Sequence, residues 1–415
     1  MIEYKVLPGG IQLVTEKLPE FQSACIGIWI GAGSVCEGPE ISGISHYIEH
    51  MFFKGTTTRS AKQLAEDTDN LGAMANAFTG KEATCYHIKA LTEVFPQAVD
   101  ILLDQLCNSV FDSKEMGRER GVIMEEMSMV QDTPDDFIMD VLTSKVFAGT
   151  PLESTIIGTK KSLRGIKREN ILEYIDTYYK KDNIVVAAAG NFDQKVLEEQ
   201  LMDKLSVFGD KSPEKADYTA PEGRRFACKT RDISQSHIAL AVPTINLASE
   251  DYYAQAIVND VLGGSMSSRL FQNIREQRGL AYTVFSSPMS YCKTGCFFIY
   301  AGLSLGKEKE AINAIGEELY KMADEGISEE LIEIVKQRLK SGYIFSNESI
   351  NSRMLRIGKN RLLMGRNYTE AEIMAEIDSI TPQQVNDFAK RIGNIKDYSG
   401  VCVSKNKVDM RKLMG

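Results

Sequence analysis

The spacing of hydrophobic residues changes several times along the chain, and each change predicts a different element. Between residues 11 and 33, β-branched and aromatic residues alternate with small or polar ones, which is typical of strands. The continuous apolar run from Ile184 to Gly190 predicts a buried strand. Apolar residues three or four positions apart predict helices over residues 91–110, 113–132 and 161–179.

The second half of the chain repeats this order of elements in a weaker form. Residues 73–91 predict two strands around Thr79-Gly80-Lys81, and the stretches CYHIKAL (85–91) and CFFIYAGL (296–303) hold the same relative place. Two residue pairs keep a separation of 207 positions, namely Gly72 with Gly279 and Phe78 with Phe285. Such an internal repeat predicts two domains that share one topology.

The predicted fold class is α+β. We expect two similar domains of about 200 residues, each a mainly antiparallel sheet packed with helices. Their boundary is the stretch 209–224, which is rich in charged residues and turn formers and has little to bury. The prediction is therefore an N-terminal domain over residues 1–208 and a C-terminal domain over residues 225–415.

Composition narrows the class of protein. Of the 415 residues, 43% are hydrophobic and 25% charged, as in ordinary globular proteins. The net charge of -9 argues against nucleic acid as a partner. The eight cysteines form no Cys-x-x-Cys pair, which favours a reducing compartment. Because no apolar run is long enough for a bilayer and the first residues do not resemble a targeting segment, we expect a cytoplasmic protein without membrane contact.

The most informative stretch is His46-Tyr47-Ile48-Glu49-His50. Two histidines four residues apart lie on one face of a helix, for which we expect Ser42 or Ser45 as the cap. That spacing lets two imidazoles reach one zinc ion, and Glu49 is close enough to act on water at the metal. A lone histidine is usually an ordinary core or surface residue, but with four histidines in the chain a chance match is about a few in a thousand.

A third ligand can come from the predicted helix over residues 113–132. Glu119 and Glu126 are seven positions apart and share one stripe of this helix within about 20°. Glu125 points about 100° away from Glu126. Carboxylates on an otherwise apolar stripe are costly to bury without a cation. The alternative is a solvated, Glu-rich helix face.

This set of side chains favours peptide hydrolysis. Two neutral imidazoles and one carboxylate leave a fourth position of zinc open, which a catalytic site requires. Zinc polarises a carbonyl oxygen and acidifies its bound water, and Glu49 would accept the proton and pass it to the leaving amine. His237 is the one histidine beyond residue 87, so the second domain cannot rebuild the site.

These residues resemble the pitrilysin, or insulinase-type, family of zinc peptidases with the inverted motif. The similarity is strongest to the short two-domain branch that includes the mitochondrial processing peptidase β-subunit and its bacterial relatives. It rests on HYIEH, on Glu126 at 76 residues after His50, and on the stretches GTTTRS, NAFTGKEATCYH and SSRLFQNIREQRGLAYTVFSS. The resemblance covers nearly the whole chain.

The resemblance implies one zinc ion per chain, held by His46, His50 and Glu126, with Glu49 as the general base. Glu119 would orient a histidine ligand. An edge strand would pair with extended substrate; its residues are Asn76, Ala77, Phe78 and Thr79. In the second domain, Arg275 and Tyr282 would contact the substrate backbone, although from their residue types alone they would be a surface cation and a packed aromatic.

The resemblance also concerns partners and location. It implies a homodimer, with a heterodimer containing an inactive chain as the alternative, and it fits a bacterial cytoplasmic relative. The short Gly263-Gly264-Ser265 stretch, where inactive α-subunits carry a long Gly-rich loop, favours an active chain that cleaves unfolded peptides or presequences. Two other classes stay open: a non-catalytic assembly protein, like the core subunits of respiratory complexes, and a metal-independent peptide-binding module.

Overall fold

The computed structural model describes residues 2–214 and 217–415, which divide by their internal contacts into two units. The first unit comprises Met1–Met127, Ser154–Ala216 and Ile344–Thr369, and the second comprises Ser128–Glu153, Asp217–Tyr343 and Glu370–Gly415. The expected boundary at 209–224 includes residues 215–216, which lie outside the described residues. The two units thus differ from the expected domains by two exchanged segments, 128–153 and 344–369.

Six strands form the sheet of the first unit, in the order β1-β2-β6-β3-β5-β4. The strands are β1 Ile2–Val6, β2 Gln12–Lys17, β3 Ser23–Ile30, β4 Met74–Thr79, β5 Thr84–Leu91 and β6 Ile184–Gly190. All neighbours are antiparallel except β2 and β6, which are parallel. β6 is buried along its whole length, as its unbroken apolar run predicts, because helices cover both faces of the sheet there.

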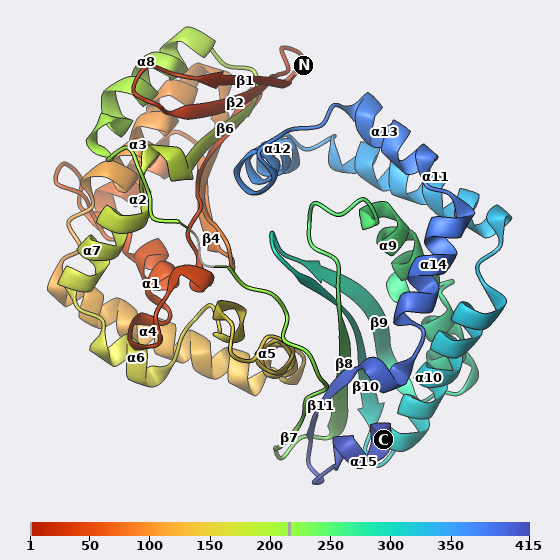
Figure 1. Cartoon of the computed structure of the whole chain (residues 1–415). Helices are drawn as coiled ribbons and strands as arrows, with labels where there is room; N and C mark the ends of the chain where they lie inside the picture. Colours follow the sequence, from red (N-terminus) through yellow and green to blue (C-terminus); the bar gives the residue numbers. More distant parts are fainter. Residues whose placement is uncertain (1, 215–216) are drawn as a thin grey trace. The chain divides into compact units, whose positions relative to one another are not determined.

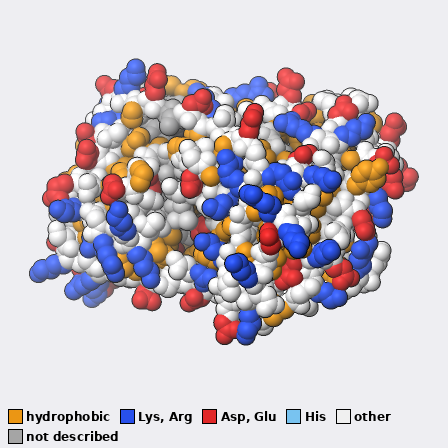
Figure 2. Space-filling model, turned by 60° about the horizontal axis from the view of Figure 1, so that its bottom comes forward, with side chains coloured by type: hydrophobic (Ala, Val, Ile, Leu, Met, Phe, Trp, Pro, Cys, Tyr) orange, Lys and Arg blue, Asp and Glu red, His pale blue; other side chains and the backbone are white. Residues whose placement is uncertain are grey.

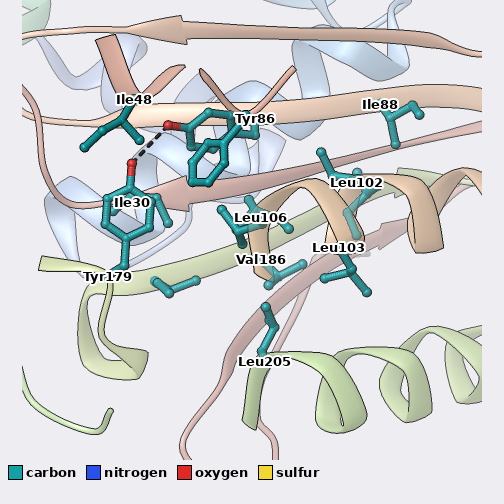
Figure 3. Close-up of a cluster of buried hydrophobic side chains, with 14 of the residues drawn as sticks. Ile30, Ile48, Tyr86, Ile88, Leu102, Leu103, Leu106, Tyr179, Val186 and Leu205 are labelled. Carbon is teal, nitrogen blue, oxygen red and sulfur yellow. Dashed lines mark hydrogen bonds between the residues drawn. The ribbon is translucent and has the colours of Figure 1, made fainter. Parts of the chain in front are cut away.

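Helices that follow the strands in sequence cover one face of this sheet. They are α1 Ile44–Met51, α3 Phe95–Asn108, α4 Ser113–Asp132, α6 Lys160–Gly165, α7 Arg168–Tyr178 and α8 Gln194–Lys204, while α2 Ala61–Asn70 packs on α3 and β4. Figure 3 shows part of this core, where Leu102, Leu103 and Leu106 of α3 lie against the sheet. The hydroxyl groups of Tyr86 and Tyr179 pair at 3.0 Å, which satisfies two buried polar groups.

The other face of the first sheet is covered by a helix from far along the chain. This helix is α12, Ile350–Met364, which lies beside β6, β2 and β3 (Figure 1). Met354 of α12 sits over Gly27, and Gly358 sits over Trp29, so close that a Cβ on either glycine would come within 3.0 Å of its neighbour. Residues 350–364 fall within the expected C-terminal domain, but the apolar side of α12 completes the core of the first unit.

The second unit repeats the topology of the first. Its strands are β7 Phe226–Thr230, β8 Gln235–Thr244, β9 Ala281–Ser290, β10 Gly295–Ser304 and β11 Ser399–Ser404, in the order β7-β11-β8-β10-β9. This is the order of β2-β6-β3-β5-β4, with the same single parallel pair at the same place. The predicted repeat and the α+β fold class are confirmed.

Helices also cover both faces of the second sheet. One face packs against a core that includes residues of α9 Tyr252–Asn259, α10 Glu308–Glu325, α11 Glu329–Ser346, α14 Pro382–Ile392 and α15 Met410–Met414. The unit also contains α13 Glu370–Ser379. The helix α5, Pro134–Val146, comes from the first half of the sequence and packs on β8, β11 and β7. A π-helical segment, Phe271–Gln277, precedes β9.

The surface carries both signs of charge. Figure 2 shows a face on which basic, acidic and apolar side chains are interspersed, in keeping with 48 Lys and Arg against 57 Asp and Glu. Among the described residues, no helix is both long and apolar enough to cross a membrane.

Candidate metal centre

The helix with the histidine motif, α1, is amphipathic. Its buried side consists of Ile44, Ser45, Tyr47, Ile48 and Met51. The opposite side carries His46, Glu49 and His50, which are half-buried. Core packing therefore fixes the direction in which these three side chains point.

The start of α1 is held differently from the expectation. The cap residue is Gly43, at φ 92°, rather than Ser42 or Ser45. A Cβ at Gly43 would come within 3.0 Å of the carbonyl oxygen of Ile157, so only glycine fits. The carboxylate of Glu37 accepts hydrogen bonds from the backbone N–H groups of Gly43 and Ser45 at 2.6 and 2.9 Å, which satisfies two free donors of the first turn.

Helix α4 brings a carboxylate to the two imidazoles. Glu126 Oε2 lies 3.7 Å from His46 Nε2 and 3.5 Å from His50 Nε2. Ligands of one tetrahedral zinc ion lie about 3.3 Å apart, so the donor set fits that ion. Within the described residues, these three side chains are the one group of histidine, cysteine and carboxylate ligands whose atoms all come within 4.8 Å of one another. Glu125, one residue earlier, is exposed.

The state of His46 suits a metal ligand. Burial, together with the neighbouring His50, lowers the pKa of His46 to about 4. Its imidazole is therefore neutral at pH 7, and a neutral nitrogen has the lone pair that a metal bond requires. The two rings meet edge to face with their centroids 4.7 Å apart.

His50 is oriented by a carboxylate and a lysine. Its Nδ1 lies 3.1 Å from Oε2 of the buried Glu119, whose Oε1 pairs with Lys54 Nζ at 2.6 Å. A proton on Nδ1 that is donated to Glu119 leaves Nε2 free to face Glu126. The resemblance implies that Glu119 orients a histidine ligand, and it does not point to Lys54. The signal was present, because a buried carboxylate needs a cation and Lys54 follows His50 by one helical turn.

Glu49 lies beside the ligands and has a threonine partner. Burial raises the pKa of the Glu49 carboxyl, while a hydrogen bond from the Thr79 hydroxyl to Oε2 acts in the opposite direction. Sequence reasoning placed Thr79 on the substrate-binding edge strand and did not anticipate this contact. A half-buried carboxylate next to a metal site is suited to accept and return a proton.

Two family models match most of this chain. Residues 12–160 match the family model described as "Insulinase (Peptidase family M16)", and residues 165–339 match "Peptidase M16 inactive domain". The chain is 37% identical to the "Uncharacterized zinc protease YmxG" of Bacillus subtilis over 97% of this chain and 98% of that protein. This chain belongs to peptidase family M16. An uncharacterized zinc protease of Streptomyces coelicolor is 34% identical over 93% of this chain and 86% of that protein.

Solved structures share the M16 fold at low sequence identity. The crystal structure of a peptidase M16 inactive domain from Pseudomonas fluorescens has a TM-score of 0.89 and 18% identity, over 98% of this chain and 99% of that one. A chain of Complex III2 from Candida albicans has a TM-score of 0.84 and 18% identity, over 100% and 99%. The fold is therefore shared by chains from a structure titled as a peptidase M16 inactive domain and from one titled as Complex III2.

The predicted edge strand of the M16 chain is β4, which has a strand neighbour, β5, on one side only. Its side chains alternate between faces. Ala75, Ala77 and Thr79 are more buried than Met74, Asn76 and Phe78. Phe78 packs on Trp29, on the face that α12 covers, with ring centroids 5.4 Å apart. The pairing of β4 with a peptide stays a prediction.

Arg275 and Tyr282 lie in the second unit and contact each other. The Arg275 guanidinium carbon is 5.1 Å from the ring centroid of Tyr282 and 4.7 Å from that of Phe271. Tyr282 is 74% exposed, so it is not the packed aromatic that its residue type suggests. The role of the pair in substrate binding stays a prediction.

Proposed function

We propose that this M16 chain is a zinc-dependent endopeptidase that hydrolyses peptide bonds in unfolded, extended peptides or presequences. The observation that carries the proposal is the convergence of His46, His50 and Glu126 beside the carboxylate of Glu49. The curated relatives named zinc proteases support the same class of chemistry.

Each residue would have a distinct part in the reaction. When bound, zinc would supply Lewis-acid chemistry at the peptide carbonyl and at water. His46, His50 and Glu126 would hold it, and Glu119 would fix the ring of His50. The Glu49 carboxylate would take a proton from the attacking water and return it to the nitrogen of the leaving amine. Burial raises the pKa of the Glu49 carboxyl, which makes it a stronger base than a solvent-exposed glutamate.

The remaining proposals concern binding and assembly. The edge of β4 that has no strand neighbour would pair with the extended peptide, and Arg275 with Tyr282 would contact the peptide backbone. We also propose that the chain forms a homodimer and is located in the cytoplasm. Light scattering of the purified chain would test the dimer, with a monomer as the contrary result.

A single substitution separates catalysis from metal binding. Glu49→Gln keeps the size of the side chain but removes the base, so we expect hydrolysis of a quenched peptide to fall about 10²–10⁴-fold while one zinc per chain remains. His46→Ala should lose the zinc as well. A chelator should stop the wild-type enzyme, and added zinc should restore it.

The exposed neighbour of the third ligand provides the matched control. Glu125→Gln removes one negative charge from the same turn of α4 and should keep both zinc and activity. Activity that survives Glu49→Gln, or that ignores the chelator, would refute the endopeptidase proposal.

A non-catalytic assembly role is the second candidate. It is favoured by the shared fold with a chain of Complex III2 from Candida albicans. Metal analysis discriminates between the two, because an assembly protein has no need of bound zinc. Suppose that the chain is purified with zinc supplied. If it then contains no zinc that the His46→Ala variant loses, the assembly role is supported.

A further inference from the structure

Thr79 connects the edge strand to the base. It is the last residue of β4, and its side chain lies on the more buried face of that strand, with Ala75 and Ala77. From there its hydroxyl donates a hydrogen bond to Oε2 of Glu49, and α1 and β4 are in contact. A carboxylate has two acceptor oxygens, so a donor fixed on one oxygen leaves the other for a second partner.

The backbone that carries Thr79 is held firmly. The turn after β4 is closed by a hydrogen bond from Gly80 N–H to the carbonyl of Ala83 at 2.8 Å. The loop that precedes α1 is fastened to the same turn, since Val35 N–H donates to the carbonyl of Lys81 at 2.9 Å. A Cβ at Gly33 would come within 3.0 Å of the Gly80 carbonyl oxygen, so the two loops approach as closely as glycine allows.

We infer that Thr79 is a positioning residue for the base: its hydroxyl holds the flexible Glu49 side chain in one rotamer beside the metal ligands. This inference rests on the proposed function of Glu49. The inference concerns the side chain of Thr79 alone and leaves the proposed pairing of the β4 backbone with a peptide unchanged.

The test uses three variants of the full, zinc-loaded chain. Thr79→Val keeps the shape but removes the donor, Thr79→Ser keeps the donor, and Thr84→Val is the control. Thr84 pairs with Thr79 across the hairpin, but its hydroxyl donates to the carbonyl of Ala32 at 2.9 Å and does not reach the site. For each variant we would measure zinc content, kcat and KM on a quenched peptide, and determine the crystal structure.

We expect Thr79→Val to lower kcat about 10–100-fold, with KM and zinc content unchanged. Thr79→Ser should restore most of the rate, and Thr84→Val should keep it. In the crystal of Thr79→Val, Glu49 should leave the rotamer that it has in the wild type.

Two results would overturn the inference. One is a rise in KM with kcat unchanged, which would indicate contact with substrate instead. The other is a Glu49 rotamer that is unaltered in Thr79→Val. If the wild-type chain has no zinc-dependent hydrolysis, the proposed function fails, and the rotamer of Glu49 in the two crystals still decides the role of Thr79.

Discussion

Arg59 lies in the segment GTTTRS (55–60) that follows α1, and three carboxylates surround its guanidinium group. They belong to Asp67, Asp100 and Asp104, at 3.1, 2.8 and 2.8 Å. Asp104 also accepts hydrogen bonds at 2.8 Å from the hydroxyls of Thr56 and Thr58. Burial raises the pKa of Asp104, but these hydrogen bonds and that of Asn108 outweigh it, and the pKa is lowered. The network fastens GTTTRS to α3.

The charge of Asp104 should stabilise the fold in a pH-dependent way. A group whose pKa is lowered by folding contributes stability above its unfolded pKa of about 4, and that contribution is lost as the pH falls through the folded pKa. Asp104→Asn should therefore lower the free energy of unfolding by about 2–4 kcal/mol at pH 7, and the difference from the wild type should shrink below about pH 4.

Urea denaturation over a range of pH provides the measurement. Asp232→Asn is the control, because Asp232 forms an exposed pair with Lys405 and should leave stability nearly unchanged. A loss for Asp104→Asn that stays constant with pH would show that the charge is not its source.

At the scale of residues, helical periodicity in the sequence predicts the direction in which a side chain points but not the residues that it contacts. Phase separates Glu126, which meets the two imidazoles, from the exposed Glu125. The contacts of Lys54 with Glu119 and of Thr79 with Glu49 were not predicted. Lys54 comes from the residues after the end of α1, and Thr79 comes from β4, which pairs with β5. Such contacts depend on how different elements pack together, and the hydrophobic periodicity of a single element does not predict that packing.

Among the elements, α12 makes a tight contact with the first sheet. Gly358 lies over Trp29, the one tryptophan of the chain, which is 3% exposed. A methyl group at this position would come within 3.0 Å of the indole ring. Gly358→Ala should therefore lower the free energy of unfolding by about 1–3 kcal/mol and shift the Trp29 emission to the red, because overpacking moves the helix away from the ring.

A glycine on α11, the preceding helix in the sequence, provides the comparison. Gly342 on α11 has no atom within 4 Å of an added Cβ, so Gly342→Ala should raise stability by up to about 1 kcal/mol. Equal stability changes in the two variants would argue against the contact of Gly358 with Trp29.

Element types were predicted well where the pattern is local. The helix over 113–132 and the strand over 184–190 have the predicted bounds. The helix expected over 161–179 is two, α6 and α7, because the guanidinium group of Arg120 binds the carbonyl oxygens of Leu163 and Ile166 at 2.9 Å. Hydrogen bonds from an arginine far away in the sequence to these carbonyl oxygens cannot be predicted from the local hydrophobic pattern.

For the whole molecule, the two halves of the sequence exchange helices. α5 from the first half packs on the second sheet, and α12 from the second half packs on the first. Fragments 1–214 and 217–415 should therefore each aggregate or fail to unfold cooperatively when produced alone, since each lacks one cover of its sheet.

Production of the two fragments together should recover the fold, measured by co-purification and by a single unfolding transition. A fragment 1–214 that unfolds cooperatively as a monomer would contradict this expectation. The sequence predicted two repeated sheets but not the exchange, because the amphipathic pattern of a helix does not state which sheet it covers.

Because of this exchange, the first sheet cannot be covered on both faces until α12 has been synthesised. The last strand of the first sheet, β6, ends at Gly190, whereas α12 ends at Met364, about 170 residues later. At synthesis rates of about 5–20 residues per second, this delay is roughly 10–35 s. The nascent chain thus leaves the ribosome with Trp29 and its apolar neighbours open to solvent or to a chaperone. The half that contains His46, His50 and Glu126 completes its core only after most of the other half has been synthesised.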